Sequence, residues 1–87
     1  MKQVAPYIWL TISDGTVTLE IDDSEVLDFV EDFFIEHVGG SFKEFTLNLS
    51  SKPLLMQFTS QVTAEEVESN LRLLDVDEIQ RIYVLNN

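Results

Sequence analysis

The chain has 87 residues, of which 45% are hydrophobic, and its 16 acidic and 5 basic residues give a formal net charge of −11. This length suits one domain over residues 1–87, and the hydrophobic content excludes a disordered acidic tail. The absence of cysteine excludes disulfides and thiolate zinc sites. Because the sequence has neither a membrane span nor a signal peptide, and its charge repels nucleic acid and anionic membranes, we expect a cytoplasmic protein that binds neither.

A β-hairpin is predicted near the start of the chain. Two runs of alternating apolar and polar residues, 8–12 and 17–21, flank Asp14-Gly15, a pair typical of two-residue hairpin turns. Such a loop fixes the strand register, so the aliphatic residues of the two runs face one another and Trp9 pairs with Glu20. Trp9, the only tryptophan, is therefore expected on the face away from the core.

A helix is predicted over residues 24–38, because apolar residues recur at a helical spacing along one side of this segment. Asp22, Asp23 or Ser24 would cap its amino-terminal end with a side-chain oxygen. The pair Gly39-Gly40 marks its carboxyl-terminal end, since glycine readily adopts the left-handed conformation that ends many helices.

The second half of the chain repeats this pattern. Alternating residues predict a third strand over residues 44–49 and a fourth over residues 54–59, although the buried face of the fourth is ambiguous. A second helix is expected to begin at Thr63, because Thr63 and Glu66 have the spacing of a capping box.

The final segment is predicted to be a strand. Residues 75–78 are expected to turn, and residues 79–85 are rich in the β-branched and aromatic side chains that favour strands. The order ββα-ββα-β predicts an α+β fold, in which two helices pack on one face of an antiparallel sheet of about five strands.

Acidic residues dominate the first predicted helix and the segment before it. Eight of the seventeen residues from Glu20 to Glu36 are acidic and none is basic. Five of these acids fall on one stripe of the helix and its flank: Glu25, Asp28, Glu31, Asp32 and Glu36. Like charges at this spacing cost a helix roughly 0.2–0.5 kcal/mol per pair. A pattern that is locally unfavourable indicates either a function or a solvated face that happens to lack lysine.

We interpret the acidic residues as the surface of a non-enzymatic binding protein, of the inhibitor, immunity or nucleic-acid-mimic type. Its partner would be a basic protein, such as a nuclease or a nucleic-acid-binding protein. The expected partner-binding residues are Trp9, Glu20, Glu25, Asp28, Glu31, Asp32 and Glu36. Five charges over a helix of about 22 Å are too sparse to imitate duplex DNA, which carries one charge per about 1.7 Å, so a general acidic interface is favoured over mimicry.

The aromatic residues of the hairpin suggest a second function. Tyr7 and Trp9 on an uncovered sheet face would suit a self-associating structural or assembly subunit, because aromatic residues are enriched where proteins associate. The protein would then be a homodimer. Alternatively, the final strand, a dimer partner or Phe42 covers these two side chains, or a bulge places Trp9 in the core.

A third class, a small enzyme or ion-binding domain, has little support in the sequence. His37 is the only histidine, has no second histidine or cysteine beside it, and is expected as a partly buried, hydrogen-bonded residue on the core side of its helix. Two acidic groups lack the spacing of a calcium loop, and capping and a turn explain them: Asp22, Asp23 and Glu25, and Asp75, Asp77 and Glu78. We expect no enzymatic activity, no cofactor and no metal site.

Overall fold

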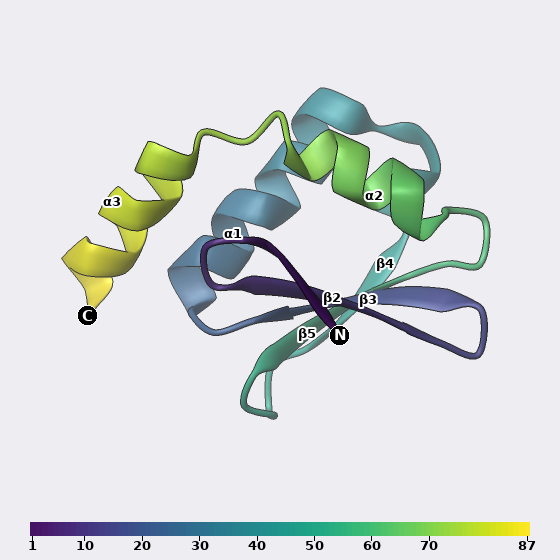
Figure 1. The fold of residues 1–87 in the computed structure, drawn as a ribbon, viewed down its shortest axis with the longest axis horizontal. Helices are drawn as coiled ribbons and strands as arrows, with labels where there is room; N and C mark the ends of the chain where they lie inside the picture. The colour runs from purple at the N-terminus through teal and green to yellow at the C-terminus, as the bar shows by residue number, and fades with distance from the viewer.

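One antiparallel sheet of five strands carries all three helices on the same face (Figure 1). The computed structural model describes all 87 residues. The strands are β1 (Lys2–Ala5), β2 (Ile8–Ser13), β3 (Thr16–Ile21), β4 (Phe45–Asn48) and β5 (Leu54–Phe58), in the spatial order β1-β2-β3-β5-β4. The helices are α1 (Ser24–Phe33), α2 (Ala64–Leu71) and α3 (Val76–Asn86). The predicted α+β class and antiparallel sheet are confirmed.

The β2–β3 hairpin has the predicted register, in which Trp9 lies opposite Glu20. Asp14 and Gly15 form its turn with φ angles of 52° and 77°, the left-handed pair that a type I′ turn requires. The aliphatic residues of the hairpin are buried beneath the helices, apart from one near the turn. Because side chains alternate along a strand, Trp9 and Glu20 point away from the helices.

Helix α1 begins where the sequence predicts because Asp23 caps it. One carboxylate oxygen of Asp23, Oδ2, accepts hydrogen bonds from the backbone N–H groups of Glu25 and Val26, each at 3.0 Å. The other oxygen, Oδ1, accepts a hydrogen bond of 2.8 Å from the side-chain amide of Asn87. These partners satisfy a carboxylate that is only 8% exposed.

Beyond α1 the chain continues as one π-helical turn, Phe34–Val38, so the predicted helical segment is continuous. The backbone N–H of Gly39 donates a hydrogen bond of 2.8 Å to the carbonyl of Phe34, and Gly39 ends the turn with a φ of 75°. A π-helix turns through a smaller angle per residue than an α-helix. The residues after Phe34 are therefore rotated less about the helix axis than an α-helical wheel predicts.

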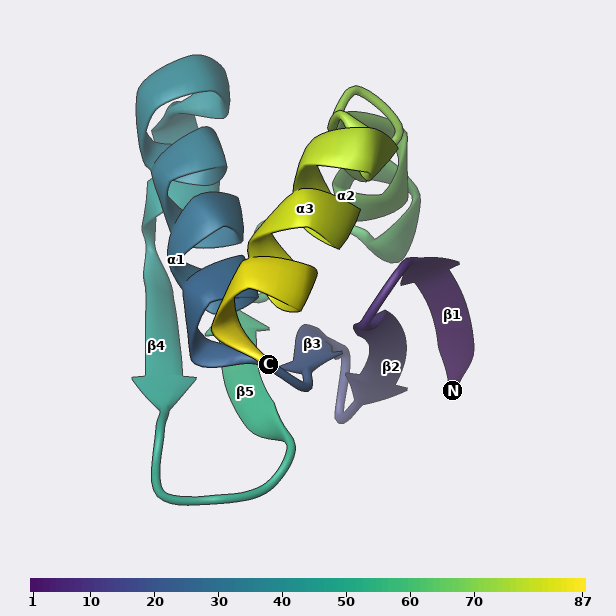
Figure 2. The same ribbon diagram turned by 90° about the vertical axis from the view of Figure 1, so that its left-hand side faces the viewer.

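The core lies between the sheet and the three helices. In Figure 2, α1 lies over β4 and β5 and α2 lies toward β1 and β2, while Figure 1 shows α3 beside α1 at the end of the molecule away from α2. Val26, Val30 and Phe34 are fully buried from the helical side, as are Leu19 and Met56 from the sheet. Burying a large apolar side chain contributes about 1.5–3 kcal/mol, so this layer holds α1 in place.

The amino-terminal end of α2 and the strands β4 and β5 follow the sequence closely. Thr63 and Glu66 form the predicted capping box, with backbone-to-side-chain hydrogen bonds of 3.0 and 3.2 Å. Leu54, Met56 and Phe58 are buried, which settles the face of β5 that packs on the core.

The end of the chain is a helix, so the prediction of a strand over residues 79–85 was wrong. Asp75 accepts hydrogen bonds from the backbone N–H groups of Asp77 and Glu78, at 3.0 and 3.3 Å. The predicted turn over residues 75–78 is therefore the cap and first turn of α3.

The spacing of the apolar residues in this segment outweighs its preference for a strand. Ile79 is fully buried and Ile82 is partly buried three residues later, a spacing that places both on one face of a helix. The fifth strand is instead β1, which pairs with β2 so that Gln3 lies opposite Trp9. The structure consequently has three helices rather than the two predicted.

Candidate functional site

The five acids predicted on one side of the first helix all belong to one continuous helical segment, and we call them the acidic stripe. It consists of Glu25, Asp28, Glu31, Asp32 and Glu36, on α1 and the π-helical turn that follows it. Four of these side chains are exposed, and Glu31 is half-buried. The stripe is therefore accessible to a partner over the length of the helix.

None of the basic residues neutralises the acidic stripe. Glu68 forms ion pairs with Lys2 at 2.9 Å and with Arg72 at 3.0 Å, and Arg81 pairs with Glu78. These ion pairs involve residues of β1, α2 and α3 and of the segment between α2 and α3. The other two bases, Lys43 and Lys52, form no ion pair. The net charge of the stripe is therefore not reduced within the molecule.

The carboxylates of the acidic stripe affect one another. Burial raises the pKa of Glu31 above its ordinary value, and the nearby charges of Asp28 and Asp32 raise this pKa further. A raised pKa means that the folded state disfavours the ionised form of Glu31. Above its raised pKa, the ionised Glu31 therefore lowers the stability of the fold, first through its burial and second through its acidic neighbours.

We expect Glu31→Gln to raise the free energy of unfolding at pH 7 by about 0.2–0.5 kcal/mol, the usual size of a like-charge helix pair. The folded state takes up the proton of Glu31 before the unfolded state does, so this gain is complete above the folded pKa. It shrinks as the pH falls through that pKa and disappears below the ordinary value of 4.5. Urea unfolding at several pH values measures it.

The exposed Glu44, which lies outside the acidic stripe, provides the control. Glu44→Gln should change the free energy of unfolding much less than Glu31→Gln does at neutral pH. A gain for Glu31→Gln that persists unchanged into the acid range would contradict the electrostatic explanation.

An open groove of about 440 Å³ runs beside the acidic stripe, between α1 and the segment that joins α2 to α3. We call this feature the groove. Its apolar wall consists of Phe29 and Phe33 from α1, and of Leu73 and Leu74 from the joining segment. Leu73 is 73% exposed, so the groove offers apolar contact at the surface of the molecule.

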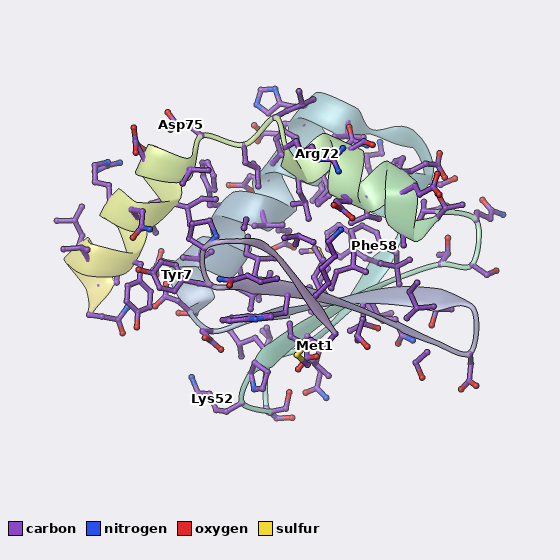
Figure 3. The ribbon with its side chains drawn as sticks, in the orientation of Figure 1. Met1, Tyr7, Lys52, Phe58, Arg72 and Asp75 are labelled. Carbon is purple, nitrogen blue, oxygen red and sulfur yellow. The ribbon has the colours of Figure 1, made fainter.

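Acidic side chains border the groove on both sides. Asp32 and Glu36 belong to the acidic stripe. Asp75, which Figure 3 labels, lies at the end of the joining segment, just before α3. Sequence reasoning did not find Leu73 or Asp75 as site residues. The only sequence signal for this part of the groove is that Leu73, an apolar residue, lies two positions before Asp75, which caps the next helix.

His37 also lines the groove, and the prediction that it is partly buried and hydrogen-bonded was wrong. Its side chain is exposed and forms no hydrogen bond with the protein. The π-helical turn explains the difference, because its smaller rotation per residue places His37 short of the core side of the helix. The centroid of its ring lies 6.0 Å from that of Phe33, so it extends the aromatic side of the groove.

Trp9 and Glu20, which the sequence analysis assigned to the binding surface, are not part of the acidic stripe. They lie opposite one another on the face of the sheet that the helices leave open, and both are half-buried. The sheet therefore separates them from the five acids of α1 and the turn after it.

The aromatic residues considered with Trp9 also lie elsewhere. Phe42 does not cover Trp9, because its ring stacks on Phe34 on the helical side, with centroids 5.8 Å apart. Tyr7 stacks on Tyr83 of α3 with centroids 3.8 Å apart and donates a hydrogen bond of 2.9 Å to Gln80. Of the predicted aromatic surface, only Trp9 lies on the open face of the sheet.

The chemistry that these surfaces offer is the attraction of cations and the burial of apolar groups. No three histidine or acidic side chains come together as a group that could hold a metal ion. No helix combines the length and the apolar character that crossing a membrane requires. Comparison with protein-family models, with curated proteins and with solved structures finds no match, so we argue the function from the geometry of this chain.

Proposed function

We propose that this protein is a non-enzymatic binding protein that docks its acidic stripe on a basic protein. The observation that supports the proposal is that five carboxylates lie within twelve residues of α1 and the turn after it, four of them exposed, and that none is paired with a base. The charges of Asp28 and Asp32 add to the effect of burial in raising the pKa of Glu31, so repulsion within the stripe contributes a cost in stability. A cationic partner would remove that repulsion.

The physics of the acidic stripe suits rapid, salt-dependent association. Opposite charges on two surfaces accelerate their encounter, and dissolved salt weakens this attraction beyond a distance of about 10 Å at 0.1 M. The stripe spans roughly 16 Å, which gives one charge per about 4 Å. That spacing approaches the one charge per about 3.4 Å of a single nucleic-acid strand. Proteins that bind nucleic acid, including nucleases, are therefore suitable partners, and an inhibitory or immunity role is a suitable outcome.

The test is charge reversal in the variant Asp28→Lys/Asp32→Lys/Glu36→Lys. The wild-type protein should capture a basic protein from its host at low ionic strength and release it as salt is added. The variant should bind the same protein roughly 10- to 100-fold more weakly, since it converts three attractive charges into repulsive ones. Isothermal titration calorimetry with the captured protein measures the ratio.

The control variant, Glu44→Lys/Glu65→Lys/Asp77→Lys, changes the net charge equally but reverses exposed acids outside the acidic stripe. It should bind within a few-fold of the wild type. Equal losses in both variants would mean that net charge alone governs binding, and no loss in the first variant would exclude the acidic stripe as the docking surface.

A second candidate function is self-association through the open face of the sheet. Trp9 lies on that face and Leu55 lies beside Glu20 on the neighbouring strand, while all three helices cover the other face (Figure 2). Sedimentation velocity distinguishes this candidate from the first. A dimer that Trp9→Ala dissociates would support it, and a wild-type monomer at high concentration would exclude it.

A further inference from the structure

We infer that the groove holds an arginine side chain of the basic partner, together with a residue beside that arginine. This inference rests on the proposed function, because it identifies the part of the partner that anchors beside the acidic stripe. The groove contributes what the stripe lacks, namely apolar and aromatic surface next to carboxylates.

The size of the groove indicates more than one side chain. A cavity of about 150 Å³ is large enough to hold benzene, whereas the groove measures about 440 Å³. Its volume lies in the range of about 300–1,000 Å³ that is usual for binding pockets. The groove is also open at the surface, because Leu73 on its far wall is exposed. A short stretch of a partner chain can therefore enter it without a rearrangement of the fold.

The aromatic wall favours arginine over lysine. Phe29 and Phe33 line one side, and His37 continues that side with its ring centroid 6.0 Å from that of Phe33. A guanidinium is planar and weakly hydrated, so it stacks on aromatic rings, whereas an ammonium is compact and strongly hydrated. The aliphatic part of the arginine would contact Leu73 on the opposite wall.

The carboxylates of the two walls can receive the charge. Asp32 and Glu36 extend from one wall and Asp75 from the other. Asp75 is held in place because its Oδ1 accepts the backbone N–H groups of Asp77 and Glu78. Its Oδ2 has no hydrogen-bond partner within the protein and remains available. An acceptor that is already fixed loses little entropy on binding, which favours a partner that can form directed hydrogen bonds.

The experiment compares two peptides of equal length, an oligo-arginine and an oligo-lysine, in titrations of the isotope-labelled protein followed by NMR. Both peptides should bind in a salt-dependent manner. The arginine peptide should bind about two- to fivefold more tightly than the lysine peptide, the size of a cation–π contact at an exposed site. It should also shift the resonances of Phe29, Phe33 and Leu73 much more strongly.

Two groove variants test the source of this preference. Phe33→Leu keeps the wall apolar but removes one of its rings, so the preference for the arginine peptide should fall. Asp75→Asn keeps the cap of α3, because asparagine caps helices as well as aspartate does, and removes one charge from the rim. It should weaken the binding of the arginine peptide about two- to fivefold without a loss of folding, which circular dichroism checks.

The control variant Glu25→Gln/Asp28→Asn lies on the acidic stripe outside the groove. It should weaken the binding of both peptides equally and leave their ratio unchanged. Equal binding of the two peptides to the wild type, or a ratio that Phe33→Leu leaves intact, would overturn the inference while the proposed function stands. Failure of both peptides to bind at low salt would overturn the inference and contradict the proposed function as well.

Discussion

Phe34→Ala is expected to lower the free energy of unfolding by about 3–5 kcal/mol, the usual cost of removing a fully buried aromatic ring. Phe34 has no exposed surface and lies at the centre of an aromatic cluster. Its ring centroid lies 5.0 Å from that of Phe58 on β5 and 5.8 Å from that of Phe42 in the segment after the π-helical turn. The ring therefore joins the end of α1 to the sheet, and alanine leaves a cavity that three elements line.

A protein of this length has a total stability of roughly 4–13 kcal/mol, so the loss would leave little margin. Urea denaturation followed by circular dichroism measures it. Ile35→Ala is the matched control, because Ile35 is the next residue and is 43% exposed. That variant should change the free energy of unfolding by no more than about 0.5 kcal/mol. Similar losses in the two variants would show that Phe34 is not the centre of the core.

Ile79→Ala is expected to lower the free energy of unfolding by about 2–5 kcal/mol. Ile79 is the only fully buried residue of α3 and has no exposed surface. Val84→Ala is the control on the same helix, because Val84 is 69% exposed and should change the stability by no more than about 0.5 kcal/mol.

Native-state hydrogen exchange adds a second measurement for Ile79→Ala. The amides of α3 should lose protection before those of the sheet, since Ile79 is the only buried side chain of the helix. Uniform loss of protection across the chain would instead mean that α3 and the sheet unfold as one unit.

The features that sequence reasoning predicted correctly are those that neighbouring residues determine. The hairpin register follows from Asp14-Gly15 and the alternation on either side, and the start of α2 follows from Thr63 and Glu66. The final helix was missed because its β-branched residues favour a strand while its spacing and its capping Asp75 favour a helix. Over so short a segment the two signals compete, and the helix is the form that buries Ile79 and packs Ile82 against the core.

The candidate site was predictable to the extent that it lies on one helix. The acidic stripe follows from helical spacing alone, and the structure places its five members on α1 and the turn after it, four of them exposed. Trp9 and Glu20 lie on the other side of the sheet, as the alternation along the hairpin predicts, so assigning them to the same binding surface did not take that predicted placement into account. The groove was not predictable, since its walls, near Phe33 and Leu73, meet only after the chain has folded.

The charges of this protein are unevenly distributed, because two of its five bases pair with the same carboxylate, and this affects how the molecule orients in solution. Glu68 binds both Lys2 and Arg72, which gathers acids and bases together around α2 and β1, while α1 at the opposite side in Figure 2 carries uncompensated anions. This asymmetry gives the protein a permanent electric dipole moment. A distant cationic body therefore exerts a torque on it and turns the α1 side forward before the two surfaces touch.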